Sequence, residues 1–60
     1  MNEHDTVILK EDFNGIKNIK KGTHGTVVFV SHTSKYVMVE FFDEKHNTIS
    51  VETLLKELVS

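Results

Sequence analysis

The sequence predicts a small all-β barrel, and the segment from residue 21 to residue 41 carries most of this prediction. Two runs of β-branched and aromatic residues, 25–31 and 35–42, are joined by a short polar turn. A Gly-x-x-Gly segment at 22–25 directly precedes the first run, as is typical of a turn that leads into a strand. A hairpin of this kind is typical of the centre of an SH3-like barrel.

The residues before the hairpin predict one strand and one long loop. Residues 5–10 alternate, with Val7 and Leu9 on one face, which predicts the first strand. Residues 11–22 have no period and contain two Asn and two Gly, so they are expected to form a loop between the first two strands. The loop has three apolar residues, Phe13, Ile16 and Ile19. An ordered loop must recover the entropy of ordering, so at least some of them are expected to pack onto the barrel.

The residues after the hairpin predict a turn at 43–46 and a fourth strand at 47–51. The tail that follows fits two structures. Its apolar spacing fits a short helix, whereas in a barrel the same residues form a 3₁₀ turn at 52–55 and a closing strand at 56–59. The barrel is favoured because the other strands need a partner to close the sheet. The expected fold is therefore a five-stranded barrel with a short helical turn near its C-terminus.

Length and composition limit the class of protein. Sixty residues predict a single domain, 1–60, with a small core. The chain has no cysteine, which favours a reducing, cytoplasmic setting over a disulfide-stabilised secreted one. No apolar run is long enough to span a bilayer, and the polar residues 1–6 do not resemble a signal peptide. No membrane role is expected.

The charged residues argue against sequence-specific DNA binding. The formal net charge is −2, and the seven cationic residues are all lysines. Arginine is the residue that reads guanine edges with two parallel hydrogen bonds, and the chain has none. Weak contact between lysines and an RNA backbone remains an alternative.

Four sequence elements resemble a family of short bacterial proteins catalogued as a domain of unknown function. They are D-x-V-x-L from Asp5, G-x-x-G-T-V-V from Gly22, V-E-F-x-D from Val39, and T-L from Thr53. The chain departs from the family pattern at His46, where a turn glycine is usual, and in lacking a loop proline. The resemblance implies an SH3-like, KOW-like barrel. Similar proteins are often encoded near toxins or their inhibitors, so the resemblance also implies an immunity or antitoxin role.

Patterns that would indicate catalysis or a cofactor are weak. The glycines at 22 and 25 open a strand rather than a helix, so they indicate turn positions with positive φ and not a dinucleotide site. The intervals between the four histidines, at 4, 24, 32 and 46, match no standard metal-ligand spacing. No nucleophile motif is present. We therefore expect no enzyme activity, no cofactor and no metal.

One row of side chains on the strand 35–42 indicates a contact surface for another protein. If Val37, Val39 and Phe41 face the core, the alternate residues face outward. This outward row has apolar anchors and an adjacent acidic rim that suits a basic partner: Tyr36, Met38 and Phe42 as anchors, and Glu40, Asp43 and Glu44 as the rim. The alternatives are that the loop or the tail covers these anchors, or that the row forms a homodimer.

The loop before the hairpin contains the one local basic cluster, Lys17, Lys20 and Lys21. It resembles the loop face that KOW-type barrels present to RNA, and a solvated lysine-rich loop is the alternative. The sequence as a whole predicts a non-enzymatic protein-binding barrel, with an inhibitor or immunity role. A KOW-type module bound to RNA or the ribosome, and a small accessory subunit of a larger enzyme, are the alternatives.

Overall fold

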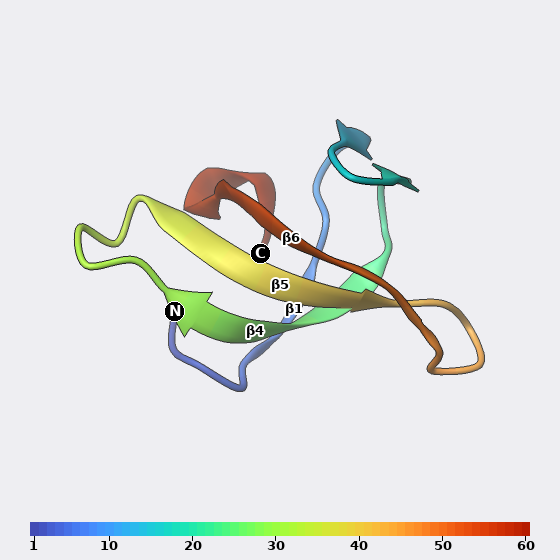
Figure 1. The fold of residues 1–60 in the computed structure, drawn as a ribbon, viewed down its shortest axis with the longest axis horizontal. Helices are drawn as coiled ribbons and strands as arrows, with labels where there is room; N and C mark the ends of the chain where they lie inside the picture. The colour runs from blue at the N-terminus through green and yellow to red at the C-terminus, as the bar shows by residue number, and fades with distance from the viewer.

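The computed structural model describes all residues, 1–60, and contains strands with almost no helix, which confirms the all-β prediction. A four-stranded antiparallel sheet has the strand order β1-β4-β5-β6. Two further strands form a small separate ribbon that stands over one end of this sheet (Figure 1). The elements are β1 (Thr6–Ile8), β2 (Phe13–Asn14), β3 (Asn18–Ile19), β4 (His24–Val30), β5 (Tyr36–Phe42), β6 (Thr48–Leu55) and a 3₁₀ helix, η1 (Lys56–Leu58).

The predicted hairpin forms the middle of the sheet as β4 and β5. Val37, Val39 and Phe41 of β5 are at most 1% exposed, so the inward face predicted from their alternation is confirmed. Val27 of β4 pairs with Val39 and is also fully buried. These side chains belong to a core of nine buried apolar residues, to which β1, the ribbon and the C-terminal segment also contribute.

The predicted loop at 11–22 contains the ribbon formed by β2 and β3. Phe13 pairs with Ile19 across the ribbon, and both pack on the core, as the sequence predicts. Ile16 does not: it lies at the ribbon tip and is 81% exposed. The ribbon thus covers the core side of the sheet while presenting one isoleucine to solvent.

The C-terminal residues differ from the expected arrangement. The fourth strand does not stop at residue 51 but continues to Leu55, and the helical turn lies at Lys56–Leu58 instead of 52–55. The physical reason lies in Leu54 and Glu52, which both face the core: Leu54 pairs with buried Val37, and Glu52 is bonded to the ribbon tip. Burial of both side chains holds this segment in the sheet.

A closing strand at 56–59 is not present, and the sheets do not close into a five-stranded barrel. A single bridge, between Leu9 and Val59, joins the C-terminus to the first strand. Ile8 and Ser60 exchange two backbone hydrogen bonds of 3.0 Å, and the Lys10 N–H donates to the Leu58 carbonyl at 2.8 Å. These bonds cover the outer edge of β1, so one edge of the sheet is occupied by the chain's own terminus.

The two glycines before the hairpin have different roles. Gly22 has a φ of 89°, the left-handed turn conformation that the sequence predicts. For Gly25 the prediction of positive φ is wrong, since this residue lies within β4. A Cβ at Gly25 would stand 2.5 Å from Val39 Cγ1 and 2.9 Å from the Glu40 carbonyl oxygen. Close packing of neighbouring strands, and not backbone conformation, therefore requires this glycine.

Candidate functional site

The face of the four-stranded sheet that points away from the core carries a group of apolar side chains. We call it the outer face. Tyr36 is 47% exposed, and Met38 and Phe42 are half-buried, so none of the three predicted anchors is completely covered within the chain. Register places more apolar side chains beside them: Leu55 lies opposite Tyr36, and Val51 lies opposite Glu40. The outer face therefore extends over β4, β5 and β6.

Phe29 is the largest member of the outer face that the sequence analysis missed. It lies opposite Met38 and is 49% exposed. Strict alternation from buried Val27 would point Phe29 inward, but a β-bulge at Val28 inserts one residue and reverses the alternation. No sequence signal marks this bulge, so the exposure of Phe29 was not predictable from periodicity.

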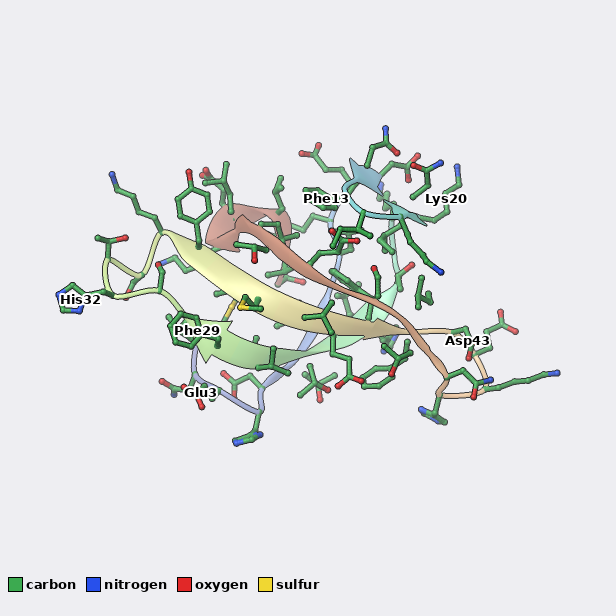
Figure 2. All side chains as sticks on the ribbon, viewed as in Figure 1. Glu3, Phe13, Lys20, Phe29, His32 and Asp43 are labelled. Carbon is green, nitrogen blue, oxygen red and sulfur yellow. The ribbon has the colours of Figure 1, made fainter.

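The predicted anchors do not form one compact patch. Phe29, Tyr36 and Met38 lie near the turn that joins β4 to β5, whereas Phe42 lies at the opposite end of β5. Figure 2 shows Phe29 far from the turn that carries Asp43 and from Lys20 on the ribbon. The anchors are thus divided between an apolar end and a polar end of the sheet.

The polar end contains an open groove of about 690 Å³. Four of the candidate contact residues line it: Lys21, Phe42, Asp43 and Glu44. The structure thus brings one lysine of the basic cluster to the same groove as two residues of the acidic rim. The other lining residues are Thr6, Gly22, Thr23, His24, Gly25, Thr26, His46 and Ile49.

Asp43 supports the turn between β5 and β6. Its Oδ1 accepts hydrogen bonds from the N–H groups of Lys45, at 2.8 Å, and Asn47, at 2.9 Å. The bond from the Asn47 backbone is the main cause that lowers the pKa of the Asp43 carboxyl below its ordinary value. His46 occupies the turn with a φ of 65°, a left-handed conformation that glycine adopts more readily than other residues. Asp43 therefore has a structural role in this turn.

Glu40 is the one charged residue among the paired positions of the outer face. It lies between Thr26 of β4 and Val51 of β6 and is half-buried. The Thr48 hydroxyl donates a hydrogen bond to its Oε2. Its other oxygen accepts no hydrogen bond from the chain, which leaves an acceptor in the middle of the face.

An acidic residue, Asp12, lies beside the basic cluster, which the sequence did not predict. Asp12 accepts a hydrogen bond of 2.8 Å from the Lys21 N–H and lies 4.0 Å from Lys20 Nζ. Lys17 lies at the tip of the ribbon, where its N–H donates to Glu52. The three lysines are exposed, but the nearby carboxylate reduces the local positive potential.

The only buried charged group of the chain is Glu52, which no sequence pattern indicated. Its carboxylate accepts hydrogen bonds from the N–H groups of Ile16, at 3.0 Å, and Lys17, at 3.1 Å, and from the Ser50 hydroxyl, at 2.7 Å. Burial raises the pKa of the Glu52 carboxyl, but these hydrogen bonds outweigh burial and hold the pKa below its ordinary value. A Cβ at Gly15 would collide with this carboxylate. Glu52 thus fastens the ribbon tip to β6.

The histidines are dispersed, and two of them line the groove: His24 and His46. His4 takes a positive φ, as His46 does, and His32 lies in the turn between β4 and β5. Nowhere in the chain do three or more His, Cys, Asp or Glu side chains form a group suited to a metal ion. None of the helices is long and apolar enough to cross a membrane.

The fold and this surface define a small all-β protein with an apolar outer sheet face and a charged groove at one end. The chain belongs to the family described as a domain of unknown function, DUF4926, whose match covers residues 3–59. Comparison with curated proteins and with solved structures gave no match.

Proposed function

We propose that this chain is a non-enzymatic, SH3-like protein-binding module of the cytoplasm that acts as an inhibitor or immunity-type partner of a basic protein. The contact surface is the apolar end of the outer face. The observation that carries the proposal is the adjacent placement of Phe29, Tyr36 and Met38, the first two about half exposed. Aromatic and Met side chains are enriched in the buried centres of protein interfaces.

The SH3-like part of the proposal is supported by the order of the elements. A long segment that contains the ribbon separates β1 from β4. The three strands β4, β5 and β6 then pair antiparallel in chain order, and the 3₁₀ turn after them leads to a bridge with the first strand. The bridge between Leu9 and Val59 occupies the position of a closing strand. A short closing contact of this kind is compatible with a partly open barrel.

The basic character of the partner is supported by Glu40. Its carboxylate retains a free acceptor oxygen within a face whose other paired residues are uncharged. A lysine or arginine of the partner would satisfy this oxygen with a charge-assisted hydrogen bond. Glu44, exposed at the polar end, adds to the attraction during encounter.

Two alternative functions receive less support. An RNA- or ribosome-associated module would use Lys17, Lys20 and Lys21, but Asp12 lies against this cluster. A small accessory subunit of a larger enzyme would bind through the same outer face that an inhibitor would use. The complex of an accessory subunit is permanent, whereas that of an inhibitor forms and dissociates, so the rate of partner exchange distinguishes the two functions.

The proposal is tested by binding with a double variant, Tyr36→Ser and Met38→Ser. The partner is first captured from lysate of the source cells and identified, and its Kd for the purified chain is then measured by calorimetry. Loss of both anchors is expected to weaken binding by about 2 kcal/mol, or roughly 30-fold. Ile16→Ser, which removes an exposed isoleucine from the ribbon tip, is the matched control and should bind as the wild type does.

The fold of each variant is monitored by the dispersion of its amide NMR spectrum. A folded double variant that binds its partner with wild-type affinity contradicts the proposed surface. A double variant that loses its fold also contradicts it, because the two side chains would then stabilise the core instead of contacting a partner. RNA captured in place of protein, with binding removed by changing the three lysines, would favour the alternative module.

A further inference from the structure

The open edge of the sheet is the backbone of β6. β6 pairs only with β5, whereas β1, at the other edge of the sheet, is bonded to the chain's own C-terminus. We infer that β6 pairs antiparallel with β6 of a second copy of this chain, which forms a two-fold dimer with a continuous sheet. This inference does not depend on the proposed function, because it rests on the backbone edge of β6 and needs none of the proposed anchors Phe29, Tyr36 and Met38.

The hydrogen-bond register identifies which backbone groups are free. The Lys56 N–H donates to the Lys35 carbonyl at 2.9 Å, so residues 35 and 56 form a hydrogen-bonded pair. In an antiparallel ladder such pairs alternate with non-bonded ones. Hence every second residue of β6 directs its N–H and C=O groups toward β5: Ser50, Glu52 and Leu54. The residues between and after them direct their N–H groups away from the sheet: Val51, Thr53 and Leu55.

This edge lacks most of the usual protection against pairing. β6 has one inward-pointing charge, Glu52, but its carboxylate is bonded to the ribbon tip on the core side and does not cover the outward backbone groups. Natural proteins commonly block an exposed edge with proline, a charged side chain or a covering segment. The chain has no proline, and the three residues with free backbone groups are uncharged. β6 has eight residues, and the irregularity in its register lies near Phe42, away from the segment 50–55. An edge of this length and regularity is suited to accept another strand.

The edge is complementary to itself when Thr53 lies on the two-fold axis. In that register Val51 of one copy lies opposite Leu55 of the other, and Thr53 lies opposite Thr53. Val51 and Leu55 are 39% and 38% exposed, so apolar surface remains for each pair to bury. Apolar and Thr–Thr cross-strand pairs both stabilise a sheet. The three pairs are hydrogen-bonded pairs, so the outward N–H groups of residues 51, 53 and 55 each meet a carbonyl of the other copy.

Neighbouring registers are less favourable. Centring on Glu52 places two like-charged residues opposite each other, which destabilises an antiparallel pair. Centring on Val51 leaves Leu55 opposite Asn47, a polar turn residue. The Thr53-centred register is therefore the one in which backbone and side chains agree. A closed two-fold contact of this kind uses the same surface on both copies, so a second copy is the occupant that fits.

The first experiment replaces Thr53 by lysine. In the dimer, Thr53→Lys places two ammonium groups opposite each other on the two-fold axis. The monomer fold is retained, because the backbone of residue 53 makes no hydrogen bond to β5 and its side chain is exposed. The dimer Kd, measured by sedimentation equilibrium, is expected to rise by at least about tenfold. Thr6→Lys is the matched control: Thr6 is also an exposed strand threonine, but it lies on β1, and this variant should dimerise as the wild type does.

The second experiment tests the register. A chain with Val51→Lys and Leu55→Lys, and a chain with Val51→Glu and Leu55→Glu, should each be monomeric alone. Mixed in equal amounts they should form a heterodimer, since each lysine then lies opposite a glutamate of the other copy. Native mass spectrometry distinguishes the heterodimer by mass, and Tyr36→Ser with Met38→Ser should leave wild-type dimerisation unchanged.

Amide exchange gives a readout that needs no variant. In the dimer the Thr53 N–H is bonded across the axis, so its exchange should slow as protein concentration rises, whereas the Thr6 N–H should not respond. The inference is overturned if the wild-type chain remains monomeric at ~1 mM, where even weak specific pairs associate. It is also overturned if Thr53→Lys dimerises unchanged, or if an extended peptide of another protein occupies β6 in its place.

Discussion

Replacing Glu52 by glutamine tests whether the buried carboxylate holds the ribbon on the sheet. The side chain is 3% exposed and accepts hydrogen bonds from two N–H groups of the ribbon tip and from the Ser50 hydroxyl. Glutamine has nearly the same shape but no charge, and it has one acceptor oxygen instead of two. One of the two ribbon N–H groups, that of Ile16 or that of Lys17, then faces an amide NH₂ group, which is also a donor.

The expected loss of stability follows from these contacts. A hydrogen bond to a charged group contributes about 1.5–3 kcal/mol, and a neutral one contributes about 1 kcal/mol. Glu52→Gln removes one charge-assisted bond and weakens the others, so the free energy of unfolding should fall by about 2 kcal/mol. For a domain of this size that is a large fraction of the whole stability.

Urea denaturation at several pH values is the assay. The pKa of Glu52 is lowered by folding, so its stabilising contribution is complete above the ordinary value of 4.5 and is lost as the pH falls through the lower folded value. Glutamine does not titrate. The difference in stability between wild type and variant should therefore be largest near neutral pH and should shrink as the pH falls below the ordinary value of 4.5.

Glu57→Gln is the matched control, since it makes the same chemical change at an exposed residue of η1. It should alter the free energy of unfolding by less than about 0.5 kcal/mol. The reasoning is refuted if Glu52→Gln is no more destabilising than this control. It is equally refuted if the amides of Ile16 and Lys17 keep wild-type exchange rates in the variant, because the ribbon would then be held by other contacts.

Two further outcomes test the core. Phe41→Ala should lower the free energy of unfolding by about 3–5 kcal/mol in thermal denaturation, because the ring is fully buried, and an unchanged melting temperature would contradict its placement. Gly25→Ala should be destabilising by ~1 kcal/mol or more, since the added Cβ meets Val39 and the Glu40 carbonyl. Gly22→Ala should also lower the free energy of unfolding, because φ is positive at this residue although the space around it is open. If strain at residue 22 and crowding at residue 25 are separate causes, the stability losses of the two substitutions should add in the double variant.

Local patterns in the sequence predicted the all-β class, the two strands of the central hairpin and the inward face of that hairpin. Val37, Val39 and Phe41 recur at every second position, and side chains of a strand point alternately to its two faces, so one face had to be buried. The two apolar loop residues that pack on the core, Phe13 and Ile19, were predicted for a related reason, since an ordered loop must bury apolar surface. The outward direction of Tyr36 follows from the same alternation.

Only the tertiary structure decided the features that depend on contacts between distant segments. The bulge at Val28 exposes Phe29, and the hydrogen bonds between Glu52 and the ribbon tip keep β6 in the sheet to Leu55. In sequence Glu52 is an ordinary acidic residue of an ambiguous tail, about 35 positions away from its partners. Alternation describes one strand at a time. Register, bulges and the burial of a charge depend on what lies opposite each residue, and that is fixed only when the segments pack together.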